Sequence, residues 1–247
     1  MRLLLALLLV PAALLLAGCS GATPPGSGPL KVGTDASYRP FEFLEGADKF
    51  AGFDIELMQA VGREIGRPVE FRNSPFDGLI PGLKAGHFDV AISCLTITPK
   101  RAEEVAFSDP YYEAGQIVAV RHDEAGIRGR EDLRGRPVGA QEGTTGLDEA
   151  KALGATVRAY GTIDLAFQDL ANGQIDAIVN DEPVSRWLVA RKPGFKLVGE
   201  LFTREQYGIA TAKGNGELIG KINEALKKIR ASGEWERIRE KWITKPQ

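Results

Sequence analysis

The sequence has little cysteine and almost no net charge, and each of these scarcities excludes a class of protein. Two cysteines in 247 residues are too few for a disulfide scaffold or a cysteine-rich metal site. The chain has 31 basic and 33 acidic side chains, a formal charge of −2, so there is no basic excess for a nucleic-acid partner. Because 43% of the residues are hydrophobic, the composition is not that of a disordered chain. These figures indicate a soluble globular protein.

Catalytic and metal-binding patterns are also scarce. The chain has two histidines: His87 precedes a predicted strand, and His122 lies in a charged loop. There is no Gly-x-Ser-x-Gly nucleophile motif, and no cluster of His, Cys and Asp has the spacing of metal ligands. The sequence therefore predicts no catalytic residues, no metal and no other cofactor.

A single long apolar run lies at the N-terminus. After Arg2, residues 3–17 form an uncharged apolar run of 15 residues, shorter than the roughly 20 of a membrane-spanning helix. A basic start and an apolar centre are typical of a signal peptide. Residues 16–19, Leu-Ala-Gly-Cys, resemble a lipobox. We therefore expect residues 1–18 to be removed and Cys19 to carry a lipid; the alternative is an ordinary signal peptide that ends near a cysteine.

The segment after Cys19 predicts a tether. Residues 20–29 contain only Gly, Ala, Ser, Thr and Pro, which form no core, so residues 19–29 are expected to be a flexible, lipid-anchored linker. A tether of this kind indicates a folded domain held at a membrane surface outside the cytoplasm. With Cys19 lipidated, Cys94 would have no partner and is predicted to be a buried free thiol.

The remaining chain alternates predicted strands and helices, which favours an α/β fold with a largely parallel sheet. The spacing Leu-x-x-Gly-x-apolar-Asp occurs at 83–89 and returns 87 residues later at 170–176. This repeat predicts two lobes built on a similar plan. The strands are expected at 31–34, 69–71, 88–92, 137–140 and 175–179. The helices are expected at 52–66, 76–83, 147–153 and 163–170, with two more near the C-terminus.

The repeat also predicts where a ligand would bind. Ser93 and Asn180 directly follow the matching predicted strands. In open α/β sheets, ligands bind beyond the carboxyl ends of the strands. Residues 93–96 and 180–182 are therefore expected to face one another across a cleft.

Arg101 is the clearest candidate for binding an anion. Thr98 and Pro99 are typical of an N-cap and a first helical residue, which places Arg101 in the first turn. A cation there opposes the helix dipole, and a bound carboxylate would explain its presence. The alternative is a solvated charge balanced by Glu103 and Glu104.

Residues 141–146, Gln-Glu-Gly-Thr-Thr-Gly, form a turn before a predicted helix, and their N–H groups would suit a small carboxylate. They lack the Gly and Lys spacing of a phosphate loop. An ordinary connection is the alternative here. Asp35 and Asp181 lie just past strands, and the aromatic residues Tyr38 and Phe76 lie near the same edge.

Together these segments resemble the periplasmic polar amino-acid-binding proteins of ABC importers, which include glutamine- and lysine/arginine/ornithine-binding members. The resemblance covers nearly the whole mature chain. It rests on seven segments in order: 33–43, 52–57, 76–81, 96–101, 107–112, 143–146 and 206–210.

The resemblance implies a periplasmic-binding-protein-like α/β fold, with two lobes joined by two hinge strands and the ligand in the cleft between them. Lobe 1 would comprise residues 30–111 and 207–247, and lobe 2 residues 112–206. It further implies a monomer at the periplasm or cell surface, anchored through Cys19, that binds an amino acid and an ABC permease in the membrane.

The resemblance also implies roles for particular residues. Arg101 would bind the ligand α-carboxylate with the N–H groups of Thr96 and Thr145, and Asp181 the α-ammonium. Ser93 or Cys94 would supply a carbonyl or hydroxyl, and Tyr38 and Phe76 would enclose the side chain. Asp35 would meet its distal end. The full predicted ligand-binding set is Asp35, Tyr38, Phe76, Ser93, Cys94, Thr96, Arg101, Gln141, Thr144, Thr145, Asn180 and Asp181.

Charge accounting favours a basic ligand. Once Arg101 and Asp181 are used on the α-groups, Asp35 is left as an unpaired carboxylate that a cationic side chain would neutralise. Gln141 stands where glutamine-binding relatives carry Lys, whereas Cys94 stands where basic-amino-acid relatives often carry Ser. Arginine or lysine is expected, with glutamine as the alternative. A dehydratase-like enzyme on the same fold is the alternative function, with Asp35 or Glu182 as the proton-transfer group.

Overall fold

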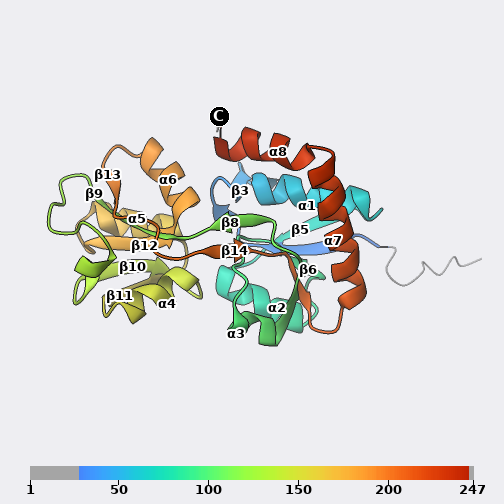
Figure 1. Cartoon of the computed structure of the whole chain (residues 1–247), viewed down its shortest axis with the longest axis horizontal. Helices are drawn as coiled ribbons and strands as arrows, with labels where there is room; N and C mark the ends of the chain where they lie inside the picture. Colours follow the sequence, from blue (N-terminus) through green and yellow to red (C-terminus); the bar gives the residue numbers. More distant parts are fainter. Residues whose placement is uncertain (1–27, 245–247) are drawn as a thin grey trace, which may run out of the picture.

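The computed structural model describes residues 28–244, which form two sheet-based units side by side (Figure 1). The predicted signal peptide, the lipobox with Cys19 and residues 19–27 of the predicted linker lie outside the described residues. Within the described part, no helix is long and apolar enough to cross a membrane.

The first unit, here called lobe 1, is built on a five-stranded sheet in the order β5-β1-β6-β15-β7. The strands β5, β1 and β6 run parallel, and β15 is antiparallel to both β6 and β7. The bounds are β1 (Leu30–Thr34), β5 (Val69–Asn73), β6 (Val90–Ala91), β7 (Val105–Phe107) and β15 (Ala210–Ala212).

Helices cover this sheet, and a small antiparallel sheet is inserted after β1. Figure 1 shows α1 and α8 above the strands and α2 and α3 below them. The helices are α1 (Phe53–Glu64), η1 (Phe76–Gly78), α2 (Leu79–Lys84), α3 (Pro99–Glu104), α7 (Gly216–Ala231), α8 (Glu234–Arg239) and the π-helical η3 (Glu240–Thr244). The inserted sheet has the order β2 (Ser37–Tyr38), β3 (Glu42–Glu45), β4 (Lys49–Ala51).

The second unit, lobe 2, repeats the plan with the order β11-β10-β12-β9-β13. Here β11, β10 and β12 are parallel, while β9 is antiparallel to β12 and β13. The bounds are β9 (Gln116–Arg121), η2 (Arg130–Leu133), β10 (Pro137–Gln141), α4 (Thr145–Ala152), β11 (Thr156–Tyr160), α5 (Ile163–Ala171), β12 (Ala177–Asp181), α6 (Glu182–Arg191) and β13 (Phe195–Val198).

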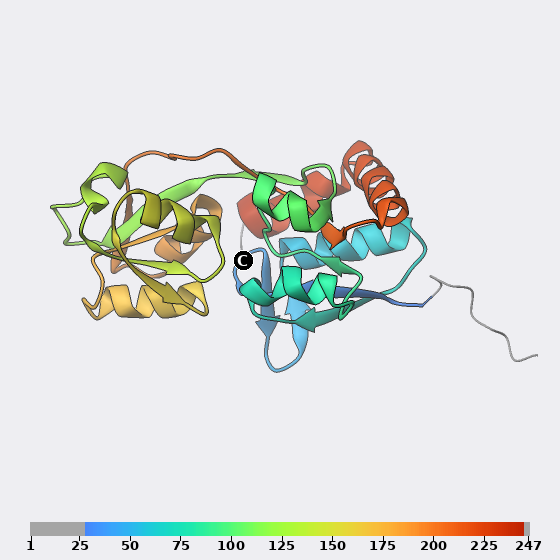
Figure 2. The ribbon, with the colours of Figure 1, turned by 90° about the horizontal axis from the view of Figure 1, so that it is seen from below.

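Two strands connect the lobes, β8 (Tyr112–Ala114) and β14 (Glu205–Tyr207), which pair with each other in antiparallel register. Figures 1 and 2 show both crossing between the lobes. At the lobe 1 end they lie against packed aromatic rings: Phe41 meets Tyr112 edge-on with centroids 5.0 Å apart, and Tyr112 stacks on Tyr207 at 5.9 Å. These contacts hold one end of the connection firmly.

The apolar periodicity in the sequence accounts for most of these elements. In α7, Leu218, Ile222, Leu226 and Ile229 form a stripe that is buried, as predicted. The helix ends where Gly233 adopts φ 76°, a left-handed conformation that favours glycine. The chain then continues into α8.

Several predicted elements differ in detail. The strand expected at 88–92 is the two-residue strand β6. The helix expected at 76–83 divides into the 3₁₀ turn η1 and α2. The strand expected at 175–179 is β12, which extends to Asp181 because it pairs with β9 up to the Asp181–Gln116 pair. Asn180 and Asp181 are therefore part of the strand and do not come after it, which corrects the prediction.

Candidate functional site

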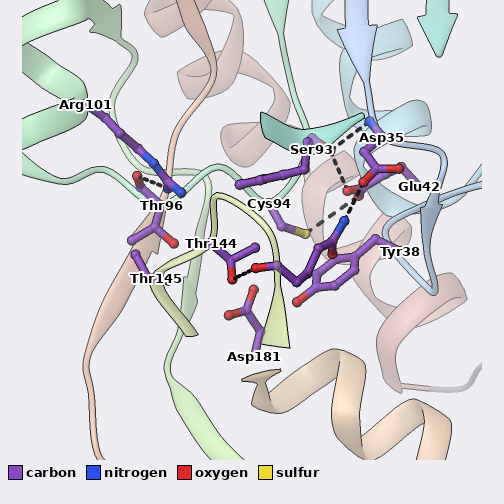
Figure 3. A pocket seen from close by; sticks show the side chains of 12 residues that line it. Asp35, Tyr38, Glu42, Ser93, Cys94, Thr96, Arg101, Thr144, Thr145 and Asp181 are labelled. Atoms are coloured by element: carbon purple, nitrogen blue, oxygen red, sulfur yellow. Dashed lines mark hydrogen bonds between the residues drawn. The ribbon is translucent and has the colours of Figure 1, made fainter. Parts of the chain in front are cut away.

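A pocket lined by residues of both lobes lies between them. Of the predicted ligand-binding residues, all except Asn180 line it, and Glu42 is an additional lining residue. The complete lining is Asp35, Tyr38, Glu42, Phe76, Ser93, Cys94, Thr96, Arg101, Gln141, Thr144, Thr145 and Asp181. Figure 3 shows Arg101, Thr96 and Thr145 gathered at one end, and Asp35 and Glu42 at the other.

Asp35 is held at the end of β1 by contacts from both lobes. Its carboxylate accepts hydrogen bonds from Ser37 Oγ at 2.8 Å and from Gln141 Nε2, across the cleft, at 2.7 Å. Its backbone N–H donates to Ser93 Oγ at 3.0 Å. Burial raises the pKa of Asp35, and hydrogen bonds from Ser37 and Gln141 oppose that rise.

Behind Asp35 lies a group of acids with no role assigned from the sequence. Glu42 is fully buried and accepts from Ser93 Oγ at 2.8 Å, and Asp54 accepts from Cys94 N at 2.9 Å and from Tyr111 Oη at 2.7 Å. Burial and the proximity of Asp54 raise the pKa of Glu42 well above its usual value. Burial also raises the pKa of Asp54, to about 6. A carboxyl that keeps its proton can share it with its ionised neighbour.

Glu42, Asp54 and Cys94 are also the one group in residues 28–244 that could hold a metal, with ligand atoms within 4.8 Å of one another. Burial and the neighbouring acids raise the pKa of the Cys94 thiol, which donates to Glu42 Oε2 at 3.7 Å. The three residues are joined by hydrogen bonds, since the backbone N–H of Cys94 donates to Asp54. Cys94 is buried, as predicted, and forms no disulfide within residues 28–244.

The sequence analysis did not identify Glu42 and Asp54 as part of the site, because charged side chains are usually exposed to solvent. Phe41 and Phe43 flank Glu42, and all three side chains are buried, so the alternation of a half-buried strand does not apply. A charged residue between two aromatic residues was the available signal.

Arg101 reaches across the cleft from the start of α3. Thr98 Oγ1 accepts the Arg101 N–H at 3.2 Å, which makes Thr98 the N-cap, with Pro99 following as predicted. The guanidinium donates to Thr96 O at 2.8 Å and to Gly143 O of lobe 2 at 2.9 Å, and it lies 5.3 Å from the centre of the Phe76 ring.

The alternative role for Arg101, a solvated charge balanced by Glu103 and Glu104, does not describe this geometry. Glu104 pairs with Lys84 at 2.7 Å, whereas Arg101 faces the cavity. Burial lowers the pKa of Arg101, and the nearby Asp181 and Glu205 oppose that change. A guanidinium stays protonated in proteins, so this is a partly buried positive charge.

The start of α4 forms the lobe 2 wall at the same end of the cavity. Thr144 is its N-cap: its Oγ1 accepts from Leu147 N at 3.2 Å and donates to Gln141 O at 2.7 Å. The first N–H groups of a helix have no partner within it, and they favour an anion. Gly143 precedes them with φ 75°, and a Cβ there would lie 3.1 Å from Asp77 of lobe 1.

Asp181 and Asn180 have different positions at the end of β12. Asp181 lines the cavity and accepts from Tyr207 Oη at 2.6 Å. Burial, and next the charge of Glu205, raise the pKa of Asp181 to about 6. Asn180 lies behind the wall, where its Oδ1 accepts from Tyr38 Oη at 2.7 Å and its amide donates to Ser185 Oγ at 3.1 Å. Asn180 therefore positions Tyr38.

The two ends of the cavity differ in charge. One end offers the partly buried guanidinium of Arg101 and the start of helix α4, which suit a carboxylate. Asp181 offers an acceptor for an ammonium group, and the far end offers Asp35 beside Glu42. These charges and hydrogen-bonding groups suit a small zwitterion that carries an additional hydrogen-bond donor or positive charge on its distal end.

Comparison with known sequences places the chain among transport proteins. The pattern of the bacterial extracellular solute-binding proteins, family 3, matches residues 30–245. A protein of Neisseria gonorrhoeae named "Probable histidine-binding protein" is 34% identical, over 94% of this chain and 92% of its own. The ABC transporter arginine-binding protein 1 of Escherichia coli is also 34% identical, over 95% of this chain and 98% of its own.

Solved structures agree with the sequence comparison. An ancestral arginine-binding protein, solved with glutamine and with arginine, is 44% identical and covers 87% of this chain and 98% of its own, with TM-scores of 0.84 and 0.83. An ancestral amino acid-binding protein described as a precursor of cyclohexadienyl dehydratase is 40% identical, covers 87% of this chain and 96% of its own, and has a TM-score of 0.82. The predicted periplasmic-binding-protein-like fold is confirmed.

Proposed function

The chain belongs to the bacterial extracellular solute-binding proteins of family 3, and from that premise we propose that it captures a basic L-amino acid, arginine or lysine, between its two lobes. The observation that carries the choice of ligand is Asp35, a carboxylate inside the cavity at the end remote from Arg101. A cationic side chain would neutralise it, whereas a purely apolar side chain would leave it buried without compensation. Relatives named for arginine and histidine binding support a basic ligand.

The remaining contacts follow the shape of an α-amino acid. Arg101 and the backbone N–H groups of Thr96 and Thr145 would bind the α-carboxylate, and Asp181 the α-ammonium. Tyr38 and Phe76, both in the cavity wall, would enclose the side chain. A guanidinium or ammonium between aromatic faces gains a cation–π attraction as well as the charge pair.

Contacts that cross the cleft explain how binding and lobe position are coupled. Gln141 of lobe 2 bonds Asp35 of lobe 1 at 2.7 Å, and Arg101 of lobe 1 bonds Gly143 O of lobe 2 at 2.9 Å. A ligand between Asp35 and Arg101 would engage the same groups, and it would thereby stabilise the closed arrangement of the lobes. The permease would then receive the closed, loaded protein.

The transport role implies an ABC permease in the membrane as the partner and the periplasm or cell surface as the location. The N-terminal pattern at residues 1–19 supports export and a lipid on Cys19, with residues 19–29 as the tether. We further propose a monomer of two lobes, residues 30–111 with 207–247 and residues 112–206. Mass spectrometry of the membrane-extracted protein tests the anchor, and an unmodified Cys19 would contradict it.

Glutamine is the second candidate ligand. The amide Nε2 of Gln141 already donates to Asp35 at 2.7 Å, so an amide from a ligand would be accepted there as well. An ancestral relative was solved with either amino acid. An amide would leave the charge of Asp35 uncompensated, which favours the basic ligands.

A dehydratase function is less well supported, and we propose that the chain is not an enzyme. Glu182 forms an ion pair with Arg186 on α6 and does not line the cavity. Asp35 is held by Ser37 and Gln141, and Arg101 and Asp181 would together bind the carboxylate and the ammonium of an intact amino acid. Recovering the added amino acid unchanged after incubation would support binding, whereas a new product would support catalysis.

A thermal-shift screen against the 20 standard amino acids tests the proposal. Arginine or lysine should give the largest rise in Tm, with glutamine next, because a ligand that binds only the folded state stabilises it by mass action. A largest shift with glutamate or leucine would contradict the assignment of Asp35.

A further inference from the structure

Glu205 is a buried carboxylate on the hinge strand β14 that does not line the cavity. Its relative exposure is 8%, and it contacts residues of both lobes. One carboxylate oxygen, Oε2, accepts from Thr96 Oγ1 of lobe 1 at 2.7 Å and from Thr145 Oγ1 of lobe 2 at 2.8 Å. The other, Oε1, accepts from Gln116 Nε2 at 3.1 Å and from Thr203 Oγ1 at 3.0 Å. All four partners donate to Glu205, so each oxygen of its carboxylate accepts two hydrogen bonds.

Two of these partners belong to the proposed ligand site. Thr96 and Thr145 both line the cavity, at the end where Arg101 lies. Because their hydroxyls bond to Glu205, these hydroxyls are already occupied, and the contact that we propose with a ligand carboxylate is through the backbone N–H groups of the two threonines. Thr145 is also the first residue of α4, whose opening N–H groups favour an anion.

Glu205 is also linked to Asp181. The amide Nε2 of Gln116 donates to Asp181 Oδ1 as well as to Glu205 Oε1, so it bridges the two carboxylates. Tyr207, two residues after Glu205 on β14, donates to Asp181 Oδ2 at 2.6 Å. Both oxygens of Asp181, which is expected to bind the α-ammonium, are thus linked to the hinge strand β14: one through Gln116 and Glu205, the other directly through Tyr207.

Resting on the proposed function, we propose that Glu205 is a positioning residue of the amino-acid site. It holds one threonine from each lobe in place for the ligand carboxylate, and its negative charge strengthens the attraction of the Asp181 end for the α-ammonium. Glu205 lies on a strand that crosses between the lobes, so its bonds to Thr96 and Thr145 depend on the closed position of the two lobes. A single oxygen can accept from Thr96 and Thr145 only when the two lobes bring those hydroxyls together.

The charge of Glu205 has a measurable consequence at Asp181. Several charged or titratable groups face Asp181: Glu205 and Tyr207 of β14, Tyr38 of β2, Arg101 of α3 and Cys94. Glu205 is the only carboxylate among them. Replacing it with neutral glutamine should lower the pKa of Asp181 from its value of about 6, because a like charge is removed.

The substitution Glu205→Gln keeps the size of the side chain but replaces one acceptor oxygen with a donor. At pH 7.5 the affinity for arginine and for glutamine should both fall roughly tenfold, because donors on Gln116 and the threonines lose acceptors. At pH 5 the difference in affinity between this variant and wild type should become smaller, because a larger fraction of Asp181 is ionised in the variant than in wild type. Glu205→Asp keeps the negative charge, so the pH midpoint of the Asp181 titration should stay unchanged. The shorter side chain should still lower the affinity for both amino acids.

The experiment is calorimetric titration with arginine and glutamine at several pH values, together with NMR titration of the Asp181 carboxyl carbon in protein without added amino acid. Glu113→Gln is the matched control, because Glu113 lies on the partner hinge strand β8 with an exposed side chain.

Unchanged affinity and an unchanged Asp181 midpoint in Glu205→Gln would overturn the proposal. Wild-type protein that binds neither amino acid would overturn the proposed function instead, and the NMR midpoint would still test Glu205. If Glu205→Gln does not fold, Glu205→Asp decides: wild-type affinity in that variant would overturn the positioning role.

Discussion

The two lobes share one sheet plan but differ in the connection between their first parallel strand and the next helix. In lobe 1, residues 35–52 separate β1 from α1 and contain the inserted sheet β2-β3-β4. In lobe 2, residues 142–144 alone separate β10 from α4. The long connection delivers the side chains of Tyr38 and Glu42 to the cavity, whereas the short one delivers the start of a helix. The same architecture thus provides side-chain acids on one side and backbone N–H groups on the other.

This difference divides the recognition of a ligand between the lobes. Asp35 and Glu42 of lobe 1 lie at the end remote from Arg101, where they would face a ligand side chain. Thr144 and Thr145 of lobe 2 lie toward the Arg101 end, where we propose that the α-carboxylate, which all amino acids share, would bind. Changes near Asp35 should therefore alter which amino acid is preferred, and changes at the start of α4 should alter all affinities alike.

The largest effect is expected where the two lobes share a function, at Arg101. Arg101→Ala removes the partly buried cation and would leave the ligand carboxylate of the proposed site without its charged partner, at a cost of about 3–5 kcal/mol, or at least 10²- to 10³-fold in affinity. Calorimetry measures this loss. Lys100→Ala, an exposed neighbour on the same helix, is the control and should bind normally. Normal affinity in Arg101→Ala would show that the carboxylate binds elsewhere.

The second prediction tests whether lobe 1 selects the side chain. Asp35→Asn removes the distal carboxylate, and truncating one partner of a buried charge pair costs about 2 kcal/mol or more, so arginine affinity should fall roughly 30-fold. Glutamine affinity should change little, because an amide can bond to another amide. Asp48→Asn, in the exposed β3–β4 turn, is the control. An equal loss for both amino acids would remove the distinction between the lobes.

The third prediction concerns pH and Asp181. Only the ionised carboxylate attracts an ammonium, and with a pKa of about 6 roughly a tenth of Asp181 is ionised at pH 5, so arginine affinity should fall about tenfold from pH 7.5. Asp54 has a pKa in the same range, so the fall should persist in Asp54→Asn. A pH-independent affinity would exclude Asp181 from the ammonium contact.

The stability of the protein without ligand should change with pH in the opposite direction to the arginine affinity. Native Asp181 holds its proton up to about pH 6, whereas in the unfolded chain its pKa is close to the ordinary 3.8. The native state therefore binds more protons between these values, and this group lowers the free energy of unfolding as pH rises through them. Asp181→Asn should flatten that part of the stability profile measured by urea unfolding; an unchanged profile would contradict the assignment.

The smallest effect is expected at the lobe 2 helix start. Thr144→Ala removes the N-cap bond to Leu147, which should cost about 1 kcal/mol of unfolding free energy and lower the affinity for arginine and glutamine by the same few-fold factor. Thr162 is the N-cap of α5 without a side-chain cap bond, so Thr162→Ala is a matched control with little effect. A change in the arginine-to-glutamine ratio in Thr144→Ala would contradict the division between the lobes.

The sequence predicted the repeated plan and most of the cavity wall because both depend on local patterns. Strand periodicity placed Asp35 and Ser93 at strand ends, and the Thr98–Pro99 cap placed Arg101 in a first turn. It did not show that Asn180 lies behind the wall, since that depends on the antiparallel pairing of β12 with β9. Glu42 and Glu205 were missed because their partners lie far along the chain: Ser93 for one, Thr96 and Thr145 for the other.

The central claim is that Asp35 of lobe 1 makes the site prefer a basic amino acid. The most direct test is calorimetric titration of arginine and glutamine into wild type and Asp35→Asn, each prepared free of bound amino acid by unfolding and refolding. We expect one arginine per chain, bound more tightly than glutamine by wild type, and a preference that disappears or reverses in Asp35→Asn. Tighter binding of glutamine to wild type, or an unchanged preference in the variant, would contradict the account.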